Sequence, residues 1–227
     1  MTARSIATTA APASPGPTGQ LPTRERILHE ASNLFARRGY HATSTREIAS
    51  AVGIRQPSLF HHFRSKVAIL QALLASDLDE AVPHAETVAR ADAPAGVRLY
   101  AYLRHDAGHL IGSPYNLSGL YTEEVMGDPD FAPWVERRGR LHAAIERVIR
   151  DGVASGEFVD VSPRLVREAI TGILVRTLTV YSAGAPTAGE DFADEIASLV
   201  LRSVLRSPRR LPSIRRQTMA LDTRRPR

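Results

Sequence analysis

Residues 23–66, TRERILHEASNLFARRGYHATSTREIASAVGIRQPSLFHHFRSK, contain three short stretches of helical spacing and decide how the chain folds. Apolar side chains recur at intervals of three and four residues between Ile27 and Phe35, which places them on one face of a helix. Thr23 can cap this helix, and Gly39 suits its end because glycine readily adopts the left-handed conformation found there. We therefore predict a first helix over about residues 23–38.

Two shorter helices joined by a tight turn follow. Ser44 and Glu47 have the Ser-x-x-Glu spacing of a capping box, which opens a second helix that ends at Gly53. A third helix begins near Gln56-Pro57, since proline suits a first helical turn. This arrangement fits a helix-turn-helix, whose second helix enters the major groove of DNA. Spacing alone leaves open a small helical bundle with no role in DNA binding.

The rest of the chain also has helical periodicity and no alternating run of strand quality, so we predict an all-α fold of nine helices. Ser65 can cap a fourth helix over about 66–81. Proline and glycine separate five more, over about 94–111, 117–126, 128–155, 163–182 and 190–205. The expected organisation is a disordered tail over 1–20, a helix-turn-helix domain over 21–66, a second domain over 67–206, and a disordered Arg-rich tail over 207–227.

Composition limits the classes of function. The chain has no cysteine, which excludes disulfides, thiolate metal sites and a cysteine nucleophile. No apolar run is long enough to span a membrane and no convincing signal peptide is present, so we expect a cytoplasmic protein without a membrane partner. The net charge is +5 over residues 21–70, −8 over 71–205 and +7 over 206–227. Basic segments flanking an acidic middle suggest one part that binds nucleic acid and one that does not.

Residues 23–43 and 44–53 resemble the first and second helices of the TetR family of repressors, and residues 54–66 resemble its recognition helix and the start of its fourth helix. The resemblance is close over about 50 residues; beyond them it extends only to the number and lengths of the helices. It implies a homodimer with a three-helix DNA-binding domain and a six-helix ligand-binding and dimerisation domain. The last two long helices would pair with their twofold mates as a four-helix bundle. Such a protein represses from a palindromic double-stranded DNA operator and is released by a small-molecule effector.

The candidate DNA contacts lie on the second and third helices and at the start of the fourth. Gln56 suits adenine and Arg55 suits guanine, whereas hydroxyl groups and cations near the second helix suit phosphates. The full set is Thr43, Ser44, Thr45, Arg46, Arg55, Gln56, Pro57, Ser58, Phe60, His61 and Lys66. Two residues depart from the family pattern: Phe60 replaces the usual Tyr, and Arg55 stands where Ser or Thr often caps the recognition helix. For each polar residue the alternative is an ordinary solvated helix face.

Candidate ligand-binding residues lie in the middle helices. His105 and His109, four residues apart, can face one metal ion, line a polar pocket or lie on a plain helix surface. No third ligand follows from the spacing, so we predict neither a metal nor a cofactor. Arg176 interrupts an apolar run and needs a partner if it is buried: an acidic ligand, an interface carboxylate or water. The set is Tyr100, His105, His109, Tyr121, Trp134 and Arg176.

Two rival functions belong to other classes. A His-dependent hydrolase in the central domain is disfavoured because no motif pairs a nucleophile with a base. A structural nucleic-acid-associated protein without a ligand would depend on the Arg-rich tail, which we expect either to add non-specific DNA affinity or to be a solvated tail too far from DNA to matter.

Overall fold

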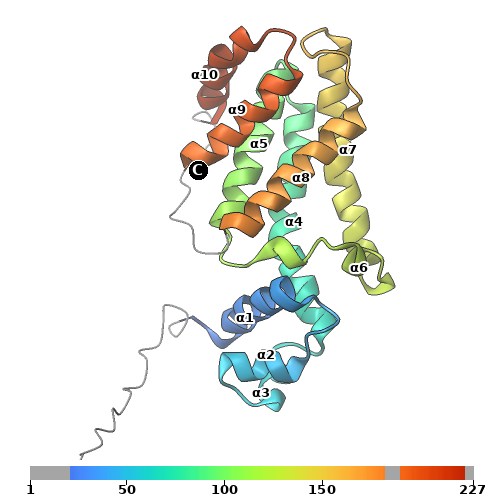
Figure 1. Cartoon of the computed structure of the whole chain (residues 1–227), viewed down its shortest axis with the longest axis vertical. Coiled ribbons are helices and arrows are strands. Elements are labelled where there is room, and N and C mark those ends of the chain that lie inside the picture. The colour runs from blue at the N-terminus through green and yellow to red at the C-terminus, as the bar shows by residue number, and fades with distance from the viewer. Residues whose placement is uncertain (1–20, 182–189, 223–227) are drawn as a thin grey trace, which may run out of the picture.

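The computed structural model describes residues 21–181 and 190–222, and both stretches are almost entirely helical. Figure 1 shows an elongated molecule with the N-terminal helices at one end and a helical bundle at the other. The helices at the first end are α1 (Thr23–Arg38), α2 (Thr45–Val52) and α3 (Gln56–His62). The bundle is formed by α4 (Lys66–Arg90), α5 (Ala95–Gly112), α7 (Ala132–Ala154), α8 (Pro163–Tyr181), α9 (Glu190–Val204) and α10 (Leu211–Asp222).

The N-terminal helices form over the predicted residues, but the expectation that Thr23 caps α1 is wrong: Thr23 is the first helical residue, Pro22 is the N-cap, and no side chain caps this helix. α1 ends at Gly39, whose φ of 84° is in the region that favours glycine. At the start of α2 the Ser44 hydroxyl accepts from the Glu47 N–H at 3.2 Å, and the Glu47 carboxylate accepts from the Ser44 N–H at 2.8 Å. The capping box is therefore confirmed. Gly53 ends α2 in the left-handed conformation and turns the chain into α3.

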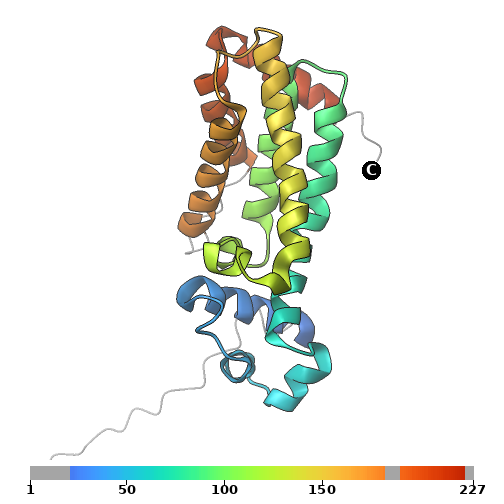
Figure 2. The ribbon, with the colours of Figure 1, turned by 90° about the vertical axis from the view of Figure 1, so that its right-hand side faces the viewer.

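Helix α4 is longer than predicted, because it continues past Ala81 to Arg90 with Pro83 inside it. A proline within a helix costs about 3 kcal/mol. Here the exposed Pro83 lies on the outer side, while Val82, Ala85 and Val88 are buried in the core of the bundle. Burial of this apolar stripe offsets the lost backbone hydrogen bond. One helix therefore runs from the α1–α3 end along the bundle (Figure 2).

The chain between α5 and α7 departs from the predicted single helix over 117–126. It forms the 3-10 turn η2 (Leu117–Gly119), the short α6 (Glu123–Met126) and the 3-10 turn η3 (Pro129–Phe131). Leu117, Leu120, Val125 and Phe131 are buried in the same apolar core as α1–α3. Although this segment belongs to the C-terminal half by sequence, it completes the core of the N-terminal half.

The expectation of a disordered tail after Arg206 is wrong for the described residues up to 222, because they form the 3-10 turn η4 (Pro208–Arg210) and α10. Leu211, Ile214 and Thr218 are buried, and the Thr218 hydroxyl donates to the Ile214 carbonyl oxygen at 3.1 Å. Arg215 forms an ion pair with Asp194 of α9. The high Arg content of this segment predicted disorder and hid the helical spacing of Leu211, Ile214 and Thr218. The described residues accordingly contain ten α-helices rather than nine, whereas residues 1–20 and 223–227 lie outside them.

Candidate DNA-binding surface and effector cavity

Helix α3 presents a set of exposed side chains at the end of the molecule, held in place by a buried inner face. Leu59 is fully buried and Phe63 is buried, so both belong to the core, as the sequence predicts. The residues of α3 and its N-cap that point outward are Arg55, Pro57, Phe60, His61 and His62. Arg55 makes no side-chain cap hydrogen bond, consistent with the loss of the usual Ser or Thr cap. The exposed guanidinium is therefore free to meet a partner.

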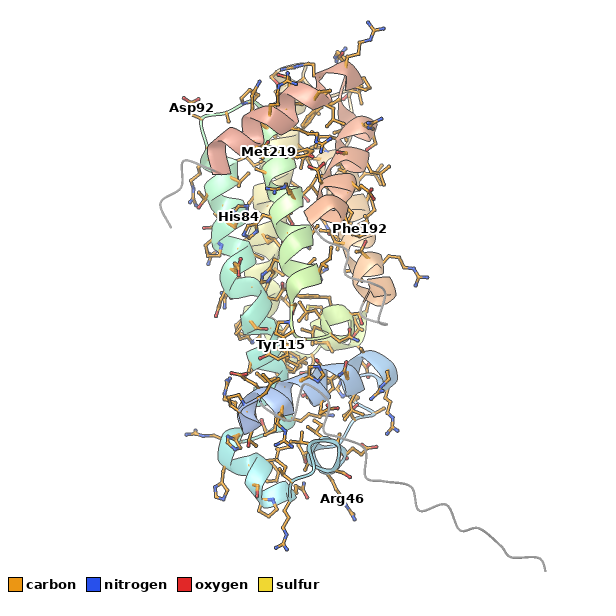
Figure 3. All side chains as sticks on the ribbon, turned by 90° about the vertical axis from the view of Figure 1, so that its left-hand side faces the viewer. Arg46, His84, Asp92, Tyr115, Phe192 and Met219 are labelled. Carbon is orange, nitrogen blue, oxygen red and sulfur yellow. The ribbon has the colours of Figure 1, made fainter. Side chains whose placement is uncertain are left out.

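A hydrogen bond between side chains fixes α3 against α2. The Gln56 amide nitrogen donates to the Thr45 hydroxyl at 2.9 Å. An amide nitrogen carries two hydrogens, so Gln56 keeps one donor and its carbonyl oxygen for a base edge. Arg46 lies on the exposed side of α2, near the foot of the molecule in Figure 3. These residues remain candidates for DNA contact.

Thr43 and Ser44 are placed differently from the expectation. Thr43 is fully buried, and its hydroxyl donates to the Gly39 carbonyl oxygen at 2.8 Å, so this side chain is withdrawn from the surface. The Ser44 hydroxyl is occupied within the capping box, where it donates to Glu47 at 2.8 Å. Hydrogen bonds from the Ser44 N–H and hydroxyl also lower the pKa of Glu47. Both residues serve the α1–α2 turn, and only the backbone near Ser44 remains suited to a phosphate.

The Lys66 ammonium group is occupied by hydrogen bonds within the protein and is not free to bind a phosphate. Its ammonium donates to the carbonyl oxygens of Tyr40 at 2.8 Å and Thr43 at 2.9 Å, with that of His41 at 3.4 Å. It also lies over the Tyr40 ring at 4.2 Å from the centroid, and burial lowers its pKa. Three carbonyls occupy the three donors of an ammonium group, so Lys66 ties the start of α4 to the α1–α2 turn.

The C-terminal half contains a cavity between α4, α5, α7 and α8, with a volume of about 60 Å³. Its apolar walls are contributed mainly by aliphatic side chains of these helices. Its polar lining divides into an acidic wall on α4 and α5 and a basic wall on α7. The polar lining residues are Asp77, Tyr102, Asp106, Tyr121, Arg138, His142 and Thr171.

The acidic wall is a compensated network of buried groups. Tyr121 donates to Asp77, and Tyr102 donates to Asp106 at 3.0 Å. His109 lies 3.3 Å from the second oxygen of Asp77, and this contact raises the pKa of His109. Burial, followed by the nearby charge of Asp77, raises the pKa of Asp106 to about 7. One oxygen of each carboxylate accepts from a tyrosine hydroxyl, whereas the second oxygen of Asp77 has His109 as a charge partner and no hydrogen bond among the described residues.

The basic wall is not compensated in the same way. The Arg138 guanidinium lies 4.9 Å from the centroid of the Tyr121 ring and forms no ion pair with any residue that the structure describes. Neighbouring Arg167 forms ion pairs with Glu146 at 3.1 Å and with Glu168 at 2.8 Å. Burial, and then Arg138 and Arg167, lower the pKa of His142 to about 4. The field at this wall is therefore positive.

Of the six predicted ligand-binding residues, Tyr121 lines the cavity and the others lie elsewhere. Tyr100 is buried but donates to Asp194 of α9, and Trp134 stacks under Arg137 at 5.1 Å. His105 and His109 lie on α5 with Glu80 of α4 between them, 3.3 and 3.2 Å away. Among the described residues no group has the arrangement needed to hold a metal ion.

Six polar residues of the cavity were not predicted from the sequence: Asp77, Tyr102, Asp106, Arg138, His142 and Thr171. Asp77 and Asp106 each interrupt the apolar face of a helix. A charged residue at such a position was the available signal for a buried polar site.

Helices α8 and α9, which lie at the front in Figure 1, each leave a leucine exposed. Leu165 of α8 is 68% exposed and Leu199 of α9 is 61% exposed. Ala169, Gly172 and Arg176 continue the Leu165 stripe along α8, and all are exposed. Arg176 is therefore on the outer surface rather than buried. Of its three candidate partners, an interface carboxylate and water remain, and an acidic ligand in the cavity is excluded.

Comparison with family models matches two parts of the chain. Residues 27–73 match the model described as bacterial regulatory proteins, tetR family. Residues 98–204 match the model described as Tetracyclin repressor-like, C-terminal domain. The two matches cover the helix-turn-helix with the start of α4, and the bundle from α5 to α9. Among the described residues no helix is long and apolar enough to cross a membrane.

Individual relatives span most of the chain. The HTH-type transcriptional regulator UidR of Escherichia coli (strain K12) is 30% identical over 179 residues, which cover 77% of this chain and 86% of UidR. The HTH-type transcriptional repressor KstR2 of Mycolicibacterium smegmatis is 27% identical over 199 residues, which cover 81% and 91% of the two chains. The crystal structure of Mycobacterium smegmatis AmtR superposes with a TM-score of 0.70 at 32% identity, covering 96% of this chain and all of AmtR.

Proposed function

The chain belongs to the TetR family of bacterial transcriptional regulators, and we propose that it represses from a palindromic operator as a homodimer and is released by a small-molecule effector. Its relatives are transcriptional regulators, so the hydrolase alternative is excluded. The observation that carries the proposal is the α2–Gly53–α3 turn, which presents exposed side chains at the start of α3 on a buried inner face. The operator, the dimer and the effector are parts of the proposal.

Specific DNA reading is assigned to the start of α3. Arg55 is exposed at the N-cap, where a guanidinium can pair bidentately with guanine, and Gln56 keeps the groups it needs for adenine. Pro57 and Phe60 offer apolar surface for a thymine methyl or a sugar. Arg46 on α2 and His61 on α3 are suited to phosphates or base edges. We retain these residues as the DNA-contacting set and exclude the Thr43 hydroxyl and the Lys66 ammonium.

Dimerisation is assigned to α8 and α9. Leu165 of α8 and Leu199 of α9 are both largely exposed, and a contiguous apolar surface of this kind favours a protein–protein interface. Gly172, with nothing within 4 Å of a Cβ added there, lets a second helix approach closely. Arg176 of α8 and Glu195 of α9 are both exposed on these helices and supply opposite charges for the same interface.

Coupling between effector and DNA has two structural supports. α4 begins beside the α1–α2 turn at Lys66 and lines the cavity at Asp77, Leu78 and Ala81. In addition, Tyr121 of the cavity belongs to the chain segment that packs on α1, where the Asn116 N–H donates to the Ser32 hydroxyl at 3.1 Å. An effector that prefers one arrangement of these elements shifts the population toward it and lowers operator affinity.

The test is selection of genomic binding sites with the purified protein, followed by titration of the selected duplex. We expect a palindrome whose half-sites lie about one helical turn apart, roughly 34–36 Å, or more if the fourth helices splay. Binding should be steeply salt dependent. Failure to enrich any palindrome at low salt would contradict the proposed function.

A further inference from the structure

Among the residues that the structure describes, Arg138 lines the cavity without an ion pair of its own, and this group identifies the kind of ligand. We propose that the effector is a small organic carboxylate with an apolar body, and that its carboxylate pairs with Arg138. The inference rests on the proposed function only in taking this cavity as the effector site. The claim about ligand chemistry can be tested without DNA.

Arg138 is the strongest argument for an anion. It lines the cavity, is partly buried, and has a ring face below it instead of a carboxylate. The acids whose charges act on Arg138 have closer partners: Glu168 pairs with Arg167, and Asp77 accepts from Tyr121 and lies beside His109. A guanidinium stays charged in proteins and presents paired donors that match the two oxygens of a carboxylate. A carboxylate entering the cavity therefore finds a preorganised fork of donors.

The same positive charges also act on a neighbouring histidine of the cavity. His142 lies one turn further along α7 and lines the same cavity. Its pKa falls to about 4, first through burial and then through the positive charges of Arg138 and Arg167. A neutral imidazole beside an uncompensated guanidinium adds a hydrogen-bonding group without adding repulsion. An anion bound here would offset the positive charges and bring the pKa of His142 back upward.

The acidic wall does not make an equal case for a cation. Asp77 has Tyr121 and His109 as partners, and Asp106 has the hydroxyl of Tyr102. Asp106 can also relieve its own charge by taking a proton, since its pKa is about 7. The guanidinium of Arg138, in contrast, cannot become neutral by losing its proton. The acidic wall is better suited to hydrogen bonding with a polar group at the far end of the ligand.

The rest of the cavity is apolar and small. Leu78, Ala81, Leu141, Ile145 and Leu174 line it. A volume of about 60 Å³ is well below the roughly 150 Å³ of an engineered apolar cavity that holds benzene, so a ligand of six or more heavy atoms must move the walls. One of those walls is Tyr121, which continues into the segment packed on α1. Entry of the apolar body therefore displaces an element that contacts the DNA-binding half.

The experiment compares three probes of one size, hexanoate, hexylamine and hexan-1-ol, by thermal shift and by titration calorimetry on the full chain. We expect hexanoate to raise the melting temperature and to bind, while the amine and the alcohol bind at least about 10-fold more weakly. In a ¹³C-histidine NMR titration, the pKa of His142 should rise when hexanoate is bound. That shift distinguishes a carboxylate beside Arg138 from one bound elsewhere.

Two variants separate the charge of Arg138 from its contribution to packing. Arg138→Gln should weaken hexanoate binding by about 10-fold or more, whereas Arg138→Lys, which keeps the charge, should lose less. The matched control is Arg137→Gln, because Arg137 pairs with Asp79 and stacks on Trp134 outside the cavity. Its affinity for hexanoate should equal that of the wild type.

Several results would overturn the inference. The first is that hexylamine binds more tightly than hexanoate and that its affinity falls in Asp106→Asn. The second is equal hexanoate affinity in Arg138→Gln and wild type. The third is that none of the three probes binds at millimolar concentration. Operator selection is run separately without any probe. A protein that selects a palindrome but ignores carboxylates contradicts the ligand inference alone, and one that binds hexanoate but no palindrome contradicts the proposed repressor function alone.

Discussion

Gly119 is the point at which the C-terminal half lies closest to α1, and replacing it by alanine tests that packing. A Cβ at this position would lie 2.6 Å from the Ala36 nitrogen, 2.7 Å from the Phe35 carbonyl carbon and 2.8 Å from the Ala36 Cα. These atoms belong to the backbone of α1, so no side chain can move aside. Gly119 has no positive φ, and the substitution therefore adds no backbone strain of its own.

The size of the effect follows from this geometry. Ordinary contacts begin near 3.4 Å, so η2 and α1 must separate by roughly 1 Å. Overpacking of this kind costs about 1–3 kcal/mol. For a chain of this length, a loss of about 2 kcal/mol lowers the melting temperature by roughly 4–8 °C. Because α1 supports α2 and α3, operator affinity should fall as well.

The assay pairs thermal unfolding with operator titration for Gly119→Ala and for Gly108→Ala. Gly108 lies inside α5 with nothing within 4 Å of an added Cβ, so alanine there should stabilise the helix by up to about 1 kcal/mol and leave operator affinity unchanged. If Gly119→Ala melted at or above the wild-type temperature with full operator affinity, the close packing of η2 on α1 would be refuted.

Four further outcomes follow from the structure. Gln56→Ala should lose roughly 1–3 kcal/mol on the operator and relax specificity at one position; equal loss on random DNA would contradict a base-reading role. Lys66→Met should lower stability and operator affinity while leaving the slope of log affinity against log salt unchanged, whereas a phosphate ligand would reduce that slope by about one. Gly172→Arg on the exposed face of α8 should dissociate the dimer in sedimentation experiments, whereas Gly139→Arg, equally open on α7, should not; identical behaviour of the two would place the interface elsewhere. The pKa of Asp106 is raised from 3.8 to about 7, so its protonated form favours the folded state: this stability is present at low pH and is lost as the pH rises from about 4 through 7. Between pH 5 and 8 the free energy of unfolding of wild type relative to Asp106→Asn should fall by about 3 kcal/mol in urea titrations, and a flat difference would show that Asp106 titrates normally.

The sequence by itself determined the helix-turn-helix, the family and most helix positions, because these depend on local signals. The capping box at Ser44, the turn at Gly53 and the apolar face of α1 all lie within a few residues of the backbone they control. Helix spacing needs only the periodicity of one stretch of chain. The same signals correctly assigned Leu59 and Phe63 to the core.

Only the tertiary structure decided which side chains meet across helices. Lys66 has the position of a phosphate ligand in sequence, but the α1–α2 turn brings three carbonyl oxygens to its ammonium. α10 is Arg-rich, yet its buried stripe finds a surface on α5, where the Thr218 hydroxyl lies 3.4 Å from the Val97 carbonyl oxygen. Arg138 and Asp106 are about 30 residues apart on different helices and line one cavity. Burial and charge compensation depend on neighbours distant in the chain, and periodicity along a single helix carries no information about them.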